Sequence, residues 1–255
     1  LLRGSWRDVT GDTEFRVYLA MLAIGSAVVV GSLAFSNDPI ALTSKTYSQT
    51  LPFEKTQLKP VEIESDLANS LEQGVFTTVS IQTTTGFCTA DFNRWPFLAV
   101  SVLVAMMFIG GCAGSTAGGL KVVRVWLVFK IIYHELEKTF RPNVIRPIKI
   151  SGGTVDADLK LAILVYVLGV VLLFAIGSLL VMMLEYGKCD YTTAATASVA
   201  SLFTIGPGLG RVGALESYGW MSSSTKMLLS IMMSLGRLEV FPLIIMLVPG
   251  FWRRV

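Results

Sequence analysis

Two short stretches of the sequence place threonine beside glycine, Thr84-Thr85-Gly86-Phe87 and Thr204-Ile205-Gly206-Pro207. Threonine offers a hydroxyl oxygen, and glycine tolerates the backbone dihedral angles that turn successive carbonyl oxygens toward one axis. Such oxygens can replace the hydration shell of a monovalent cation, and neither stretch contains a carboxylate. The pattern predicts a carbonyl-lined filter, with the cation coordinated at Thr84, Thr85, Thr204 and Ile205. The alternative interpretation is a pair of ordinary turns.

Each stretch follows a short segment rich in Ser, Thr and Ala, residues 67–82 and residues 191–203. Both segments are too short to cross about 30 Å of hydrocarbon, and each has the length of a re-entrant helix. The partly negative C-terminal end of such a helix would point at the cation. Thr85-Gly86 aligns with Ile205-Gly206 at a shift of 120 residues, since 205 − 85 is 120. Ordinary turns would not need matching re-entrant helices, so the repetition favours a filter.

Four further segments are long and apolar enough to cross a bilayer, namely residues 16–35, 96–132, 160–184 and 226–249. The 255-residue chain is 53% hydrophobic and only 15% charged, whereas a soluble domain carries about 25% charged residues. We therefore predict an all-α membrane protein with two repeats of transmembrane helix, re-entrant pore helix with filter loop, and transmembrane helix. The first repeat is expected over residues 15–132 and the second over residues 158–255, with a basic linker over residues 133–157.

Basic residues gather before the first span, after the second span and after the last one, which makes these places cytoplasmic by the positive-inside rule. They are Arg3, Arg7, Arg16, Lys121, Arg124, Lys130, Lys138, Arg141, Arg146, Lys149, Arg253 and Arg254. The acidic loop over residues 38–72 is then external, and both pore helices enter from outside. The net charge of +3 is too small to indicate nucleic acid binding. His134 is the only histidine, so the sequence offers no Ser/His/Asp arrangement and we predict no enzyme.

A glycine-rich break, GGCAGSTAGG at residues 110–119, interrupts the second predicted span. Irregular backbone at membrane depth survives only where protein buries it or water reaches it. The alternative is a close helix-packing patch, because Gly110, Gly114 and Gly118 have small-xxx-small spacing.

Arg237 lies within the last predicted span, with Glu239 two residues further on. An arginine inside the membrane is costly and marks a functional site by default. The repeat shift places Arg237 level with Ala117, inside the glycine-rich break, because 117 + 120 is 237. We expect Arg237 to project into the pore below the filter and to raise the barrier to cations. A purely structural ion pair would need an acid other than Glu239, since residues two apart on a helix do not face each other.

The motifs SIQTTTGFCTADFNRWP, FIGGCAGSTAGGLKVVR and SLGRLEVFPLII, with the closing PGFWRR, together resemble the C-terminal half of a TrkH-type potassium uptake protein. That family belongs to a superfamily with KtrB and the fungal and plant transporters, and GGCAGST favours the TrkH type. The resemblance covers essentially the whole chain from Phe15. It implies four helix–pore-helix–helix repeats around one pore. This sequence carries two that look like the third and fourth, and the first two are expected to be absent from it.

The resemblance also implies potassium uptake across the bacterial cytoplasmic membrane, a homodimer and a cytosolic TrkA-like nucleotide-binding regulatory subunit, with K⁺ as the transported ion and no organic cofactor. It implies that the glycine-rich break is an intramembrane gating loop that acts with Arg237. The expected gate residues are Gly110, Gly111, Ala113, Gly114, Ser115, Thr116, Gly118, Gly119 and Arg237.

Pro207 departs from the usual filter pattern because it has a carbonyl but no N–H, so the fourth filter strand is expected to be less ordered. Two alternatives remain open at this point: a sodium-permeable or weakly selective pore, and a structural half that assembles with the true pathway. Channel-like flow and coupled symport fit equally well.

Overall fold

The computed structural model describes residues 11–36, 39–42, 61–141, 149–150, 153–154 and 156–237. The first predicted span is helix α2 (Thr13–Phe35), which begins where the Asp12 side chain accepts a hydrogen bond from the Glu14 amide at 3.1 Å. The first pore helix is α3 (Leu67–Gln82), with the bounds expected from the sequence. A short antiparallel pair, β1 (Ile40–Leu42) and β2 (Val61–Ile63), precedes it.

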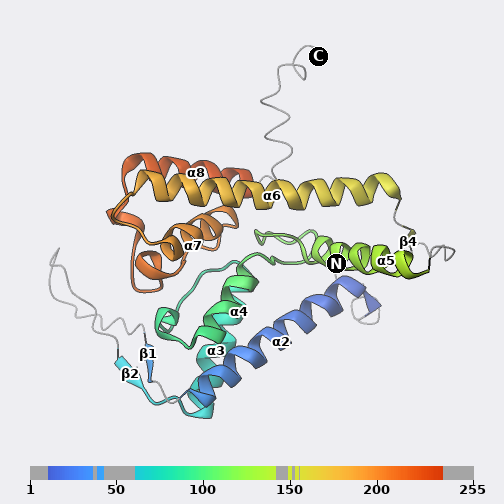
Figure 1. Cartoon of the computed structure of the whole chain (residues 1–255). Coiled ribbons are helices and arrows are strands. Elements are labelled where there is room, and N and C mark those ends of the chain that lie inside the picture. The colour runs from blue at the N-terminus through green and yellow to red at the C-terminus, as the bar shows by residue number, and fades with distance from the viewer. Residues whose placement is uncertain are drawn as a thin grey trace.

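The second predicted span is broken at the glycine-rich segment, as expected, but its two helices do not form one continuous crossing of the membrane. Helix α4 (Phe97–Met107) has 11 residues, which is about 16 Å of rise and only half a membrane. Helix α5 (Val122–Phe140) continues past residue 132, where the span was expected to end. It contacts α2 and α6, and Figure 1 shows it lying beside α6 instead of extending α4.

The second repeat consists of α6 (Ala157–Leu184), the pore helix α7 (Tyr191–Leu202) and α8 (Ser223–Arg237). Residues 238–249 of the last predicted span lie outside the described residues, as do the closing PGFWRR and Glu239. Short 3₁₀ turns follow the two filter stretches: η1 (Phe92–Arg94) after the first, and η2 (Gly210–Val212) and η3 (Tyr218–Trp220) after the second. A two-residue pair, β3 (Lys149–Ile150) and β4 (Gly153–Thr154), lies in the expected linker.

Within each repeat the three helices pack against one another, α2 with α3 and α4, and α6 with α7 and α8 (Figure 1). Glycines permit the close approach: a Cβ atom at Gly25 on α2 would overlap Met106 on α4, and one at Gly177 on α6 would overlap Met232 on α8. One hydrophobic core joins the repeats, with α4 packed against α7. Two described helices, Thr13–Phe35 and Asp158–Leu184, are long and apolar enough to cross a membrane by themselves.

Candidate functional site: two predicted filter loops beside a glycine-rich loop

The backbone turns in the same way at equivalent positions after the two pore helices. Thr84 has φ 55° and Thr204 has φ 54°, the two described non-glycine residues in the left-handed region. Two positions later, Gly86 has φ 73° and Gly206 has φ 108°. A left-handed threonine is strained by about 1–3 kcal/mol, so its recurrence at the 120-residue shift requires surrounding structure that holds it.

Equivalent hydrogen bonds hold both loops onto the ends of their pore helices. The Thr85 amide donates to the Ser80 carbonyl at 2.9 Å, and the Ile205 amide donates to the Ala200 carbonyl at 2.8 Å. Both pairs obey the same shift of 120 residues. The two stretches that were predicted from a short motif are therefore two copies of one backbone conformation.

The two loops touch each other directly through Gly86. A Cβ atom at this position would overlap the carbonyl oxygen of Ile205 and would lie 3.1 Å from Cδ of Pro207. Two features therefore require glycine at position 86: its positive φ, and the close approach of the Ile205 backbone.

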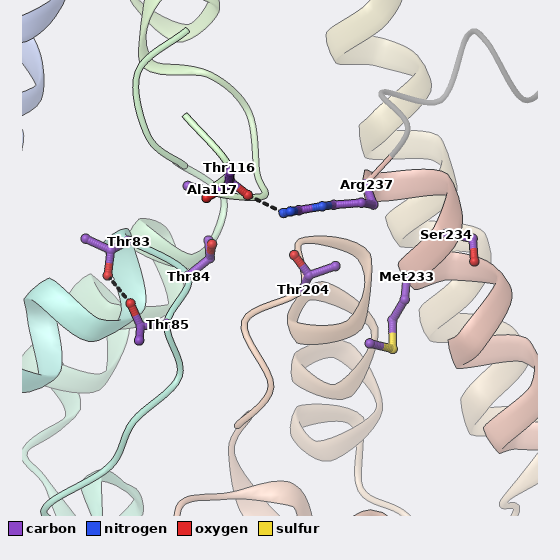
Figure 2. Close-up of a pocket in the computed structure, with 9 residues that line it drawn as sticks. All are labelled: Thr83, Thr84, Thr85, Thr116, Ala117, Thr204, Met233, Ser234 and Arg237. Atoms are coloured by element: carbon purple, nitrogen blue, oxygen red, sulfur yellow. Dashed lines mark hydrogen bonds between the residues drawn. The ribbon is translucent and has the colours of Figure 1, made fainter. Parts of the chain in front are cut away.

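A groove of about 700 Å³ lies between the loops, the glycine-rich break and α8 (Figure 2). Its lining residues are Thr83, Thr84, Thr85, Thr116, Ala117, Thr204, Met233, Ser234 and Arg237. The Thr83 and Thr85 hydroxyls lie 2.6 Å apart and share a hydrogen bond. The lining contains threonine and serine hydroxyls and one guanidinium but no carboxylate. A cation in this groove would therefore be coordinated by neutral oxygens and not by a negatively charged side chain.

Two of the predicted filter carbonyls already accept hydrogen bonds from the protein. The Ser80 hydroxyl donates to the Phe87 carbonyl at 2.8 Å, and the Tyr218 hydroxyl donates to the Gly206 carbonyl at 2.7 Å. A carbonyl oxygen has two lone pairs, so each keeps one for an ion. Burial raises the pKa of Tyr218 to about 12, so this phenol stays a neutral donor at physiological pH and holds the Gly206 peptide in place.

Tyr218→Phe is expected to lower the preference of uptake for potassium over sodium by about fivefold. The substitution keeps the ring but releases the Gly206 carbonyl, and one hydrogen bond contributes about 1 kcal/mol. Rubidium uptake competed by each ion measures the ratio, and Tyr191→Phe, at an exposed tyrosine on α7, is the matched control. An unchanged ratio in Tyr218→Phe would contradict the role assigned to this hydrogen bond.

The glycine-rich break forms a narrow loop between α4 and α5, called the hairpin below, whose entry and exit run parallel at the bridge between Ile109 and Leu120. The Gly110 amide donates to the Leu120 carbonyl at 2.9 Å, and the Leu120 amide donates to the Phe108 carbonyl at 3.1 Å. A Cβ atom at Gly110 would overlap the carbonyl oxygen of Gly118. These glycines bring the two arms of one loop together, which differs from the alternative of a helix-packing patch.

The hairpin lies against both filter loops through Gly118. The Gly118 amide donates to the Thr84 hydroxyl at 3.0 Å. A Cβ atom at Gly118 would overlap the carbonyl oxygen of Phe203, which precedes Thr204. Two cations hold the far end of the hairpin. The Arg237 guanidinium donates to the Thr116 carbonyl (Figure 2), and Lys121 Nζ donates to the carbonyls of Ser115 and Ala117, each at 2.9 Å.

The family follows from comparison of this chain with known proteins. The profile of the TrkH family, described as a cation transport protein, matches residues 7–253. The chain belongs to this family. Among its relatives, the potassium uptake protein TrkH of Salmonella typhimurium is 38% identical over 184 residues, which is 72% of this chain and 37% of that protein. TrkH of Escherichia coli is 36% identical over 191 residues, covering 75% of this chain and 38% of the relative.

The crystal structure of the potassium transporter TrkH from Vibrio parahaemolyticus shares the fold with a TM-score of 0.78. The match has 29% sequence identity and covers 97% of this chain and 46% of that one. The predicted family resemblance and the all-α membrane fold are therefore confirmed. The chain spans less than half the length of the relatives it matches.

Within this TrkH-family chain, the structure brings most of the predicted site residues together. Ser115 and Thr116 lie beside Arg237 and Gly118 lies at the filter loops, whereas Gly114 is at an open tip with φ 81°. Ala113 is held elsewhere, since its backbone amide donates to the carboxylate of Glu14 on α2.

Sequence reasoning missed several residues that line or hold the groove. Met233 and Ser234 precede Arg237 by four and three residues, so helical spacing alone places them on its face. Lys121 was counted only as a cytoplasmic charge, although its side chain holds the loop. Nothing local to the sequence connects Glu14 with Ala113.

Proposed function

We propose that this chain contributes two filter strands and the gate of a pore that takes up potassium across the bacterial cytoplasmic membrane. The observation that carries the proposal is the paired left-handed geometry at Thr84 and Thr204, each followed two residues later by a left-handed glycine. In this proposal, K⁺ sheds water against the oxygens of residues 84–87 and 204–207 and then passes the hairpin. The relatives named potassium uptake proteins support the choice of ion.

Two strands cannot close a ring around an ion, so the remaining strands must come from elsewhere. The relatives are more than twice as long as the matched region, which supports a complete transporter with two further repeats. In this proposal residues 15–132 and 158–255 are the third and fourth repeats, and residues 133–157 form a cytoplasmic linker. A homodimer and a cytosolic TrkA-like nucleotide-binding subunit complete the assembly, with no nucleic acid partner.

The gate proposed here is the hairpin together with Arg237. The Thr84 hydroxyl and the Phe203 carbonyl contact the loop at Gly118, so the loop lies directly beside the filter. The Arg237 guanidinium in the groove repels a passing cation and also donates to the Thr116 carbonyl. Opening then requires these contacts to break, after which the loop moves away from the filter.

Rubidium uptake into liposomes that hold the complete transporter tests the proposal, with competition first by potassium and then by sodium. Competition by potassium alone supports a selective carbonyl filter. Equal competition by both ions would favour the weakly selective pore, which the Pro207 departure also favours. No uptake with the regulatory subunit present would favour a structural half and contradict the proposal.

Deleting residues 112–115 from the hairpin is expected to raise basal rubidium flux about tenfold, which corresponds to a barrier lower by about 1.4 kcal/mol. The shortened loop loses the Ser115 carbonyl held by Lys121 and can no longer reach across the groove. Cys112→Ala, which keeps the loop length and the Ser115 carbonyl and is not at a positive φ, serves as the control. A tightly closed deletion variant with normal folding would contradict the gate.

A further inference from the structure

The outer ends of the two filter loops are joined by one side chain, Asn93 in η1. Its Nδ2 donates to the carbonyl of Gly210 at 3.2 Å, and its Oδ1 accepts a hydrogen bond from the amide of Gly210 at 2.8 Å. These partners lie 117 residues apart, in the segments that follow the two filter loops. The amide therefore uses both its polar ends on a single residue of the other repeat.

We propose that Asn93 is a positioning residue that sets the spacing between the two filter strands and hence the ion selectivity. The inference rests on the proposed filter. It goes beyond it by assigning the strand spacing to a side chain that coordinates no ion.

Asn93 is presented from a rigid base. The side chain of Phe92, its neighbour in η1, is fully buried. The backbone N–H of Asn93 donates to Oδ1 of the buried Asp91 at 3.2 Å, and the backbone N–H of Asp91 donates to the Ala41 carbonyl at 2.7 Å. Displacement of Gly210 would therefore pull against the core of the first repeat.

On the other side, the Gly210 segment is held to its own pore helix by two threonines of α7. The Leu209 amide donates to the Thr196 hydroxyl at 2.9 Å, and the Arg211 amide donates to the Thr193 hydroxyl at 3.3 Å. The segment is thus fixed to α7 on one side and to Asn93 on the other.

The first filter loop has an equivalent tie to its own pore helix. The Thr89 hydroxyl donates to Oε1 of Gln73 on α3 at 2.5 Å. Gln73 corresponds to Thr193 at the 120-residue shift, since 73 + 120 is 193. Each loop is therefore anchored within its repeat, and Asn93 adds the directional tie between them. Gly86 against Ile205 is a packing contact, which limits how close the strands come but does not hold them together.

Gly213 offers a second way to break the same tie. A Cβ atom at Gly213 would overlap Nδ2 of Asn93, so Gly213→Ala displaces the amide. Gly213 has φ −71°, which alanine adopts without strain. In the Asn93→Ala variant the space beside Gly213 is no longer occupied by the asparagine amide. The methyl group added by Gly213→Ala then has no side chain to displace.

The test uses the complete transporter in liposomes, with rubidium uptake competed by potassium or sodium. Asn93→Ala and Gly213→Ala should each lower the potassium-over-sodium ratio by at least about fivefold, the factor that corresponds to the contribution of one hydrogen bond. The double variant should be no worse than either single variant, because both remove one interaction. Asn69→Ala is the matched control, since Asn69 hydrogen-bonds the Glu64 carbonyl at the other end of α3.

Hydrogen exchange at the peptide that contains Gly210 measures the tie without reference to ions. Faster exchange in both single variants together with the lower ratio supports the proposal. Unchanged exchange overturns the tie, and faster exchange with an unchanged ratio overturns its role in selectivity. Additive losses in the double variant would also overturn it. An unmodified protein that takes up both ions equally would instead refute the proposed filter, and exchange would still decide whether the tie exists.

Discussion

Gly86→Ser is expected to reduce potassium-selective uptake by at least about tenfold, the largest effect of any single filter substitution. The side chain would occupy a position with φ 73° and would overlap the Ile205 carbonyl of the neighbouring strand. The backbone strain alone costs about 1–3 kcal/mol. Relief of the overlap must turn a carbonyl or separate the strands, and either change alters the coordination of the ion. Rubidium uptake competed by potassium and sodium measures both flux and selectivity.

Two further glycines separate backbone strain from strand contact. Gly206→Ala places a methyl group at φ 108° but in open space, so we expect a smaller loss than at Gly86. Gly169→Ala, in the middle of α6 with open space around it, should leave uptake unchanged. Unchanged selectivity in Gly86→Ser would remove the assignment of residues 84–87 as a filter.

Arg237→Ala is expected to raise basal cation flux about tenfold. The substitution removes a positive charge from the groove and releases the Thr116 carbonyl, so both the electrostatic barrier and the attachment of the hairpin are lost. A tenfold increase corresponds to a barrier lower by about 1.4 kcal/mol. Rubidium flux without the regulatory subunit, measured at equal protein density in the liposomes, checks this expectation.

Arg237→Lys distinguishes the two contributions. Lysine keeps the charge but has a shorter, differently shaped donor, so a variant that stays closed would assign the barrier to charge, and one that opens would assign it to the Thr116 attachment. Met227→Ala, at an exposed position of α8, is the control. Loss of flux in Arg237→Ala with normal folding would mean that the arginine is structural and not part of a gate.

Structural features that depend on residues close together in the sequence were predictable from it. The first pore helix has its predicted bounds, and the second ends at Leu202, one residue before the expected end. Apolar length, clustered threonines and the run of glycines each reflect local backbone preferences, so they located the helices, the filter stretches and the break in the second span. The repeat shift also anticipated that Arg237 would meet the loop near Ala117, and its partner is the adjacent Thr116.

The tertiary structure decided how these parts contact one another. The sequence did not indicate that α5 would lie beside α6, that Lys121 and Glu14 would hold the hairpin, or that Asn93 would join the loops. The Glu14 and Asn93 contacts join groups that are about 100 residues apart in the sequence, and the Lys121 contacts span only four and six residues but depend on how the loop folds. A single hydrogen bond contributes only about 1 kcal/mol, so no residue pattern need mark its partner in the sequence. By itself the sequence determined the elements and the chemistry of the oxygens, because both arise within a few residues. Only the tertiary packing determined the spacing of the strands and the attachment of the loop to Glu14 and Arg237, because both depend on groups about 100 residues apart.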